Sequence, residues 1–197
     1  MERIKDIVFA TNNAHKLEEV RQIVGERFRV LSLKEINCHD DIPETADTLE
    51  GNALIKARWI KERYGFDCFA DDTGLMVDAL GGAPGVHTAR YAGDDCNSEK
   101  NVSKMLSELE GVEERNAHFS TVIALIYEGQ EVVMEGRVDG IIATKRGGNG
   151  GFGYDPIFIP DGYDITFAEM PAHEKNAISH RGRAMQKLMA VLMQTDK

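Results

Sequence analysis

The chain has 197 residues, of which 42% are hydrophobic and 28% charged, the composition of an ordinary globular protein. Its net charge of -10 argues against a nucleic-acid surface, which needs a basic stripe to follow phosphates. The three cysteines are scattered and form no CxxC pair, which argues against a disulfide framework and a zinc site. No apolar run has the length of a signal sequence or a membrane span. We expect a single cytoplasmic domain over 1–197 that binds neither nucleic acid nor membrane.

The first third of the chain alternates short apolar runs with helical periodicity. Apolar residues at 17, 20, 23 and 24 repeat at helical spacing, with Asn13 as a possible N-cap and Gly25 just beyond the end. The polar stretch 37–47 contains Pro43 and predicts a loop. We expect a strand at 7–10, a helix over 17–24, a strand at 28–33 and a helix that begins in a start box at 47–50 and ends near 64.

Two adjacent carboxylates, Asp71 and Asp72, follow the apolar run 66–70 and precede Thr73 and a glycine. Successive side chains of a strand point to opposite faces, so only one of the two acids can face a given cleft. A pair of acids at a strand end indicates either a solvent-facing turn or a metal and base site. Taken alone, the sequence Asp-Asp-Thr-Gly favours the turn.

The second half of the chain predicts hairpins. We expect a glycine-rich turn at 81–85 and then a helix that Asn97 caps and Gly111 stops. A strand at 117–127, a hairpin turn at 128–129 and a returning strand at 130–137 should follow, with a further strand at 138–143 after a kink at Gly136 or Gly140. The chain should end in a strand near 154–159 and a terminal helix from Ser179. Early β/α units followed by hairpins predict an α/β fold with a mixed sheet.

Several segments are candidates for ligand binding. The strand-to-helix turn from Thr11 to Lys16 can offer backbone N–H groups to an anion, although Lys16 alone fits a surface lysine equally well. Glu44 alone indicates only a solvent carboxylate. Phe152 lies between glycines, where an aromatic ring makes a platform for a flat base. Asp155 precedes a proline, so we expect an extended residue that caps a turn or contacts a base.

A basic patch follows late in the acidic chain, at Lys175, His180 and Arg181. The pattern Gly148-x-Gly150-x-x-Gly153 is not a dinucleotide fingerprint, because it does not lie between a strand and a helix. The chain also has no GxxxxGK[ST] phosphate loop.

Taken in order, six motifs resemble those of the inosine/xanthosine triphosphate pyrophosphatases, over Ile7 to about Leu192. They are Thr11-Asn12-Asn13-Ala14-His15-Lys16, Ala70-Asp71-Asp72-Thr73-Gly74-Leu75, Gly81-Gly82-Ala83-Pro84-Gly85, Ala89-Arg90-Tyr91, Gly150-Gly151-Phe152-Gly153-Tyr154-Asp155-Pro156 and Ile178-Ser179-His180-Arg181-Gly182. The resemblance implies an elongated mixed β-sheet flanked by helices, with two lobes, an active-site cleft between them and a homodimer. Asn12 stands where glycine is common in that family, so it must adopt the backbone angles of that turn.

The resemblance also implies a chemistry: cleavage of ITP, dITP or XTP between the α and β phosphorus, with Mg²⁺, to monophosphate and pyrophosphate. Asp72 would be the catalytic acid, either as a ligand of the metal together with Glu44 or as the base toward the attacking water, and Asp71 would lie behind them. The substrate would contact Thr11, Asn12, Asn13, Ala14, His15, Lys16, Thr73, Phe152, Gly153, Tyr154, Asp155, Lys175, His180 and Arg181. Two alternatives remain open: a related Maf-type pyrophosphatase for dTTP or UTP, and a nucleotide sensor without catalysis.

Overall fold

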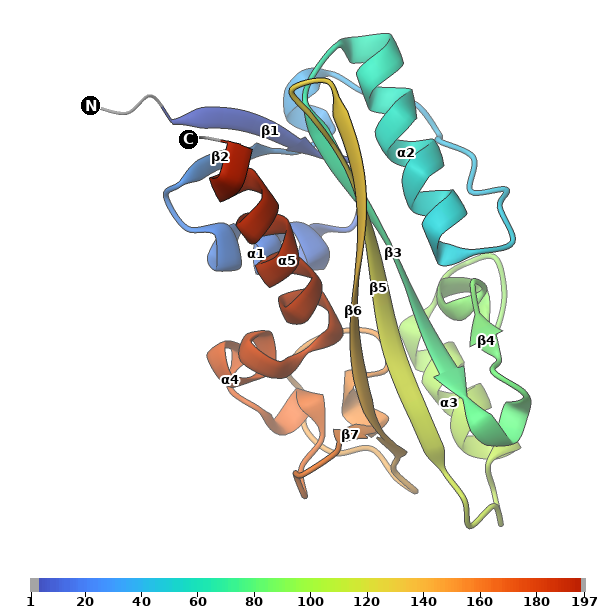
Figure 1. The fold of residues 1–197 in the computed structure, drawn as a ribbon. Helices are drawn as coiled ribbons and strands as arrows, with labels where there is room; N and C mark the ends of the chain where they lie inside the picture. Colours follow the sequence, from blue (N-terminus) through green and yellow to red (C-terminus); the bar gives the residue numbers. More distant parts are fainter. Residues whose placement is uncertain (1–3, 196–197) are drawn as a thin grey trace. The chain divides into compact units, whose positions relative to one another are not determined.

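The structure, a computed structural model, describes residues 4–195 (Figure 1). Its sheet has the strand order β2-β1-β3-β5-β6-β7, with β4 paired to β3. The strands are β1 (Lys5–Phe9), β2 (Phe28–Leu31), β3 (Cys68–Val77), β4 (Pro84–Gly85), β5 (Asn116–Tyr127), β6 (Gln130–Ile142) and β7 (Phe158–Pro160). Because β1 is parallel to β2 and β3 whereas β4 and β7 are antiparallel to their neighbours, the predicted mixed α/β fold is confirmed.

Five α-helices accompany these strands within residues 4–195. They are α1 (Ala14–Val24), α2 (Leu49–Tyr64), α3 (Ser98–Glu108), α4 (Ala172–Ile178) and α5 (His180–Thr195). The described part of the chain contains no helix long and apolar enough to cross a membrane.

The chain divides into two compact units. Unit 1 comprises residues 1–72, 121–136 and 182–197, and unit 2 comprises residues 73–120 and 137–181. The strands β3, β5 and β6 contribute residues to both. The single domain over 1–197 and the cleft between two lobes stay predictions.

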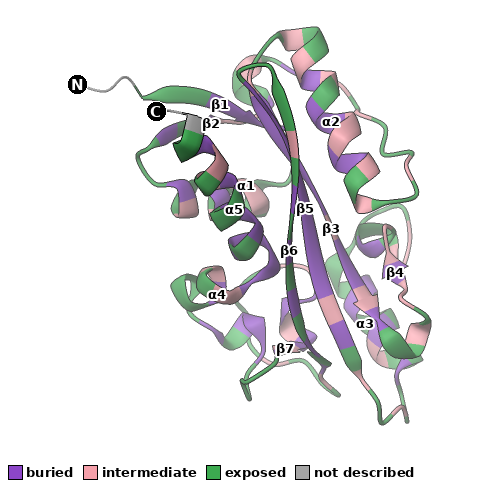
Figure 2. Cartoon of the chain, in the orientation of Figure 1, coloured by how far each residue is buried: buried purple, intermediate pink, exposed green. Residues whose placement is uncertain are grey.

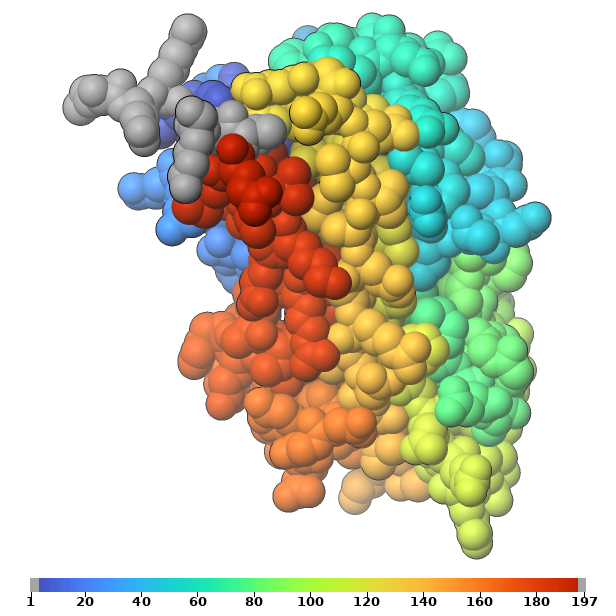
Figure 3. All heavy atoms as spheres, viewed as in Figure 1, coloured from blue at the N-terminus to red at the C-terminus, as the bar shows by residue number. Residues whose placement is uncertain are grey.

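Unit 1 buries both faces of its part of the sheet. Ile7 and Phe9 of β1 pack with α1 and α5, whereas Val8 of β1 and Ala10, the residue after the strand, pack with α2. Alternation along the strand explains this division, and burial on both sides explains why the run at 7–10 is apolar throughout. Figure 1 shows α2 lying along β3, and Figure 2 shows buried residues along this part of β3. The outer side of α5 carries exposed residues such as Lys187 and forms part of the surface in Figure 3.

Unit 2 has a separate core rich in phenylalanine. Phe119 of β5 meets Phe158 of β7 edge to face, with ring centroids 4.7 Å apart. Leu75 and Val77 of β3 and Met105 of α3 belong to the same buried cluster. The helix predicted after Asn97 is thereby confirmed, as is its cap, since Asn97 accepts a hydrogen bond from the Lys100 N–H.

The prediction that Asp71 and Asp72 end a strand in a turn is wrong. The strand β3 continues through both acids and Thr73 to Val77, with β1 and β4 both paired to it. Neighbouring strands supply ladder partners along its length and outweigh the local preference of Asp-Asp-Thr-Gly for a turn.

The two strands predicted at 130–137 and 138–143, with a kink at Gly136 or Gly140, are instead one strand, because β6 is continuous from Gln130 to Ile142. A Cβ atom at Gly140 would lie 2.3 Å from the carbonyl oxygen of Ile159, so the glycine permits the close approach of β7. The hairpin turn before β6 is confirmed: Glu128 and Gly129 both have positive φ, 48° and 77°, as a type I′ turn requires.

The start of one helix and the presence of another differ from expectation. Thr48, not Asp47, caps α2, and its side chain accepts from the Gly51 N–H. The short helix α4, between Pro171 and Ser179, was not predicted, because seven residues are too few for a clear periodicity.

Candidate functional site

The turn between β1 and α1 forms as predicted and is capped by its own side chains. Asn13 Oδ1 accepts from the backbone N–H groups of His15, at 3.0 Å, and Lys16, at 3.2 Å, and Thr11 Oγ1 accepts from the Asn13 N–H. Asn12 does not have a positive φ, so asparagine fits here without strain. A phosphate at this turn would share or replace these local acceptors.

The side chain of Lys16 links this turn to the acid pair. Its Nζ lies 3.2 Å from Asp71 Oδ1, and only 2% of the Asp71 side chain is exposed. The turn and the middle of β3 therefore meet within unit 1, and the first acid is the one that pairs with the lysine.

Asp72 lies beside α2 and is 8% exposed. The side-chain amide of Asn52 donates to Asp72 Oδ2 at 3.1 Å. Burial raises the pKa of Asp72 to about 6, the negative charge of Glu44 adds to this, and the ammonium of Lys56 opposes it. This carboxyl therefore takes and releases a proton close to neutral pH in the absence of a metal.

Lys56, one turn after Asn52 on α2, is a buried lysine among the acids. Its Nζ lies 3.0 Å from Glu44 Oε1 and also donates to the main-chain oxygen of Asp71. Burial opposes its charge, but the carboxylates of Asp71, Glu44 and Asp72 outweigh burial and raise the pKa of Lys56.

Sequence reasoning missed Asn52 and Lys56. A signal was present, because both lie at helical spacing beside Ala53, Ala57 and Ile60, the buried face of α2. Two polar side chains on a buried helix face require partners, and here the partners are the acids of β3 and of the preceding loop.

Glu44 and Asp72 are suitable donors for a magnesium ion. Both offer hard carboxylate oxygens, and they are close enough for the charge of one to raise the pKa of the other. Residues 4–195 contain no group of three or more His, Cys, Asp or Glu side chains arranged as a metal centre. Magnesium is commonly held by one or two carboxylates together with water and substrate phosphates, so two acids fit it.

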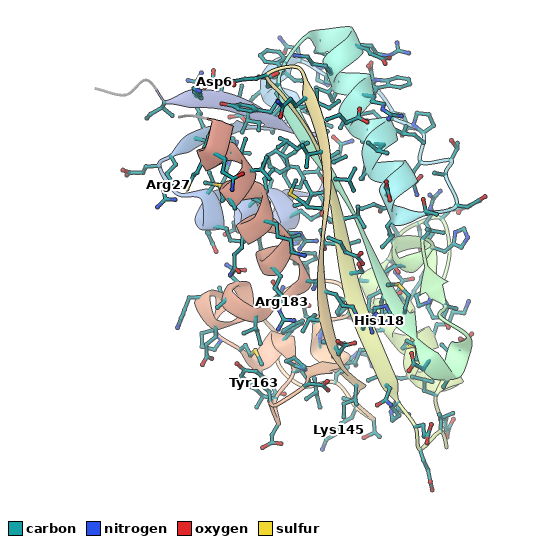
Figure 4. All side chains as sticks on the ribbon, in the orientation of Figure 1. Asp6, Arg27, His118, Lys145, Tyr163 and Arg183 are labelled. Atoms are coloured by element: carbon teal, nitrogen blue, oxygen red, sulfur yellow. The ribbon has the colours of Figure 1, made fainter. Side chains whose placement is uncertain are left out.

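Unit 2 gathers the residues predicted for the base. The Lys175 ammonium lies 4.8 Å from the ring centroid of Phe152, and the Arg181 guanidinium carbon lies 5.5 Å from it. Arg181 also donates to Thr73 Oγ1 at 3.3 Å. Both cations are buried, unlike the exposed Arg183 labelled in Figure 4. An aromatic ring with cationic donors beside it suits a flat base that carries acceptor oxygens.

The proline after Asp155 predicted an extended conformation for this residue, and that prediction is wrong. Asp155 instead begins a 3-10 turn, η4 (Asp155–Ile157). Its Oδ2 accepts from the Phe152 N–H at 2.9 Å and from Lys175 Nζ at 2.6 Å. The carboxylate thus caps the glycine-rich loop and holds the lysine beside the ring. Contact between Asp155 and a base stays a prediction.

Two other predicted substrate contacts, His180 and Tyr154, are buried in unit 2. His180 is 4% exposed and stacks on Phe119, with ring centroids 4.6 Å apart. The Tyr154 hydroxyl donates to the main-chain oxygen of Thr88 at 2.7 Å, and burial raises the pKa of Tyr154. Gly153 has a φ of 61° and open space where a side chain would begin. Their contacts with a substrate stay predictions.

Gly151→Ala is expected to damage the loop around Phe152. Gly151 has a φ of 65°, and an added Cβ would lie 2.1 Å from Asp155 Oδ2. The left-handed backbone alone costs about 1–2 kcal/mol for alanine, and the carboxylate must also move. We expect a lower Tm in a thermal melt. Gly153→Ala is the control, since Gly153 also has a positive φ but no atom close enough to clash with an added Cβ. Equal losses of Tm in the two variants would contradict the expected clash with Asp155.

The comparison with known proteins decides the family. The pattern of the Ham1 family matches residues 7–191. This chain belongs to the Ham1 family. The dITP/XTP pyrophosphatase of Flavobacterium johnsoniae is 51% identical over 189 residues, which cover 96% of this chain and 98% of that protein. The dITP/XTP pyrophosphatase of Porphyromonas gingivalis is 52% identical over 191 residues, 96% of this chain and 98% of that protein.

Solved structures of Ham1 proteins share the fold. The Ham1 protein of Staphylococcus aureus aligns with a TM-score of 0.87 at 37% identity, covering 98% of this chain and 100% of that chain. A nucleoside-triphosphatase / dITP/XTP pyrophosphatase of Mycobacterium abscessus aligns with a TM-score of 0.74 at 43% identity, covering 93% and 98%. The family resemblance and the fold class predicted from sequence are therefore confirmed.

Proposed function

We propose that this Ham1 family protein hydrolyses the non-canonical purine nucleoside triphosphates dITP, ITP and XTP to the monophosphate and pyrophosphate, cleansing the nucleotide pool. Relatives about half identical over nearly their whole length carry the name dITP/XTP pyrophosphatase, which supports this activity. The observation that carries the proposal is the buried Asp72 beside Glu44, with the ammonium groups of Lys16 and Lys56 around them.

The residues of unit 1 suit the triphosphate. Lys16 and the turn before it supply a cation and N–H donors for phosphate oxygens. In the absence of a metal Asp72 has a pKa of about 6, which suits a base that accepts a proton from an attacking water near neutral pH. Glu44 and Asp72 would hold Mg²⁺, which supplies charge neutralisation for the pyrophosphate leaving group when bound.

The residues of unit 2 suit the base. Phe152 offers a ring for stacking, and Lys175 and Arg181 place donors beside it. Hypoxanthine and xanthine carry an acceptor oxygen at position 6, whereas adenine carries an amino donor there. A buried donor without an acceptor costs about 1–3 kcal/mol, so adenine should be disfavoured roughly ten- to hundredfold.

The proposal is tested by comparing kcat/KM for pyrophosphate release from dITP, ITP, XTP, ATP, GTP, dTTP and UTP with MgCl₂. We expect the three deaminated purines to be preferred over ATP by about ten- to hundredfold, because ATP leaves the O6 donors unsatisfied. Removing the metal with EDTA should abolish release. Equal rates on all purines would contradict the proposed base recognition.

The same assay separates the two alternatives. Preference for dTTP or UTP would indicate a Maf-type pyrophosphatase, which the names of the relatives do not favour. Tight binding of ITP without turnover would indicate a sensor. The presence of Lys16, Glu44 and Asp72 in one cluster of unit 1 supports an enzyme instead.

The proposal extends to a cytoplasmic homodimer. Two of the three cysteines are buried and all three are free, which suits a reducing compartment. Light scattering on the purified protein tests the oligomeric state, and twice the monomer mass of 21.9 kDa is the expected result.

A further inference from the structure

We propose that Asn52 is a positioning residue, which fixes the distance between Glu44 and Asp72 by joining their two segments. The inference rests on the proposed function, in which these two acids act together. Glu44 lies in a loop of residues 38–48 that contains neither helix nor strand, which we call the Glu44 loop. Asp72, in contrast, lies in the strand β3. A loop without regular structure does not by itself place a carboxylate accurately beside a strand.

Asn52 uses both ends of its side-chain amide to join the two segments. Its Oδ1 accepts from the Ala46 N–H of the Glu44 loop at 2.9 Å, and its Nδ2 donates to Asp72 Oδ2 at 3.1 Å. The residue is 2% exposed, so water does not readily replace either bond. One buried side chain thus connects the backbone two residues after Glu44 with the carboxylate of Asp72.

The chemistry of the partners fixes the orientation of this amide. A backbone N–H only donates, and an ionised carboxylate only accepts. A flipped amide would place a donor against the Ala46 N–H and an oxygen against Asp72, and would lose both bonds. Asparagine is therefore suited to this position, since it is a short side chain that accepts on one side and donates on the other.

Two further contacts seat the same loop on α2. A Cβ atom at Gly51 would lie 2.6 Å from the Ala46 side chain, so the loop packs closely on the first turn of the helix. One turn later, Lys56 reaches Glu44 itself. Lys56 acts through charge, whereas Asn52 sets the backbone position of the loop and the rotation of the Asp72 carboxylate.

Two substitutions at Asn52 separate its two bonds. Asn52→Ala removes both, so we expect faster amide hydrogen exchange in 38–48 and a kcat for dITP lower by about ten- to hundredfold, because small misplacement of catalytic groups has effects of this size. Asn52→Asp keeps an oxygen for the Ala46 N–H but loses the donor to Asp72. We expect near-normal exchange in the loop and a similar loss of kcat. In both variants KM should change less than kcat.

Asn101 provides the matched control. It is also buried, and its amide joins two backbone groups, accepting from the Ala92 N–H and donating to the Ala89 oxygen, within unit 2. Asn101→Ala should lower Tm about as much as Asn52→Ala, but keep kcat within about threefold and leave exchange in 38–48 unchanged, because it also breaks one accepted and one donated amide hydrogen bond, but neither involves Asp72 or the loop 38–48.

The proposal is overturned if Asn52→Ala leaves loop exchange unchanged, if Asn52→Asp keeps wild-type kcat, or if Asn101→Ala loses as much kcat as Asn52→Ala. Failure of the proposed function has a different signature, namely no pyrophosphate release by the wild type. Hydrogen exchange would then still decide whether Asn52 holds the loop.

Discussion

Asp72→Asn is expected to lower kcat for dITP and XTP by about 10²–10⁴-fold, the usual contribution of a positioned general base. The amide cannot accept a proton from water and is a poor ligand for Mg²⁺. Asparagine has nearly the same shape and can still accept from Asn52, so the fold should be preserved. Steady-state kinetics measure the loss, and activity within threefold of wild type would remove Asp72 from the catalytic role.

The same substitution should stabilise the metal-free protein at alkaline pH. Folding raises the pKa of Asp72 from 3.8 to about 6, so the folded state holds a proton that the unfolded state releases. The free energy of unfolding therefore falls as pH rises from about 4 to about 6, and the full penalty, about 3 kcal/mol, is present above that range. Asparagine carries no such penalty.

Urea unfolding in EDTA at several pH values tests this expectation. The Asp72→Asn protein should be more stable than wild type by up to about 3 kcal/mol above pH 7, and the two should converge below pH 4. Asp71→Asn is the matched control with the opposite sign, because Asp71 is a buried ion-pair partner of Lys16 and the substitution removes that pair. Equal shifts in the two variants would contradict the electrostatic account.

Asp155→Ala is expected to destabilise the protein by about 3–5 kcal/mol, because it leaves the ammonium of Lys175 buried without its carboxylate. The Phe152 N–H loses its acceptor at the same time. We expect a large drop in the urea midpoint and a higher KM for dITP, since the ring and the lysine are no longer held together.

The double variant Asp155→Asn with Lys175→Met serves as the control. Asparagine can still accept from the Phe152 N–H, and methionine fills the space without a buried charge. This protein should regain most of the stability that Asp155→Ala loses, because replacing a whole buried pair costs far less than breaking it. It should also have a weaker preference for dITP over dATP, since Lys175, one of the two donors beside the ring, is gone. A stable Asp155→Ala protein would contradict the structural role of the pair.

Local signals in the sequence predicted the elements that depend on local chemistry. The Asn13 cap, the glycine after α1 and the hairpin at 128–129 formed as expected, because a side-chain acceptor or a left-handed glycine acts on its own neighbours. Phe152 lies beside Lys175 and Arg181 in unit 2, as the family resemblance implied.

The parts that sequence reasoning missed depend on neighbours distant in the chain. β3 continues through Asp71 and Asp72 because other strands pair with it, and turn statistics contain no such information. Lys56 is buried only because three carboxylates converge on it, whereas a lysine on a helix is normally expected in solvent. His180 stacks inside unit 2 because Phe119, far earlier in the sequence, offers its ring.

Hydrolysis of dITP or XTP in ¹⁸O-labelled water, followed by ³¹P NMR of the products, tests the central claim most directly. Attack of water on the α phosphorus predicts label in the monophosphate and unlabelled pyrophosphate. Release of orthophosphate would contradict cleavage between the α and β phosphorus, and label in the pyrophosphate would contradict attack of water on the α phosphorus.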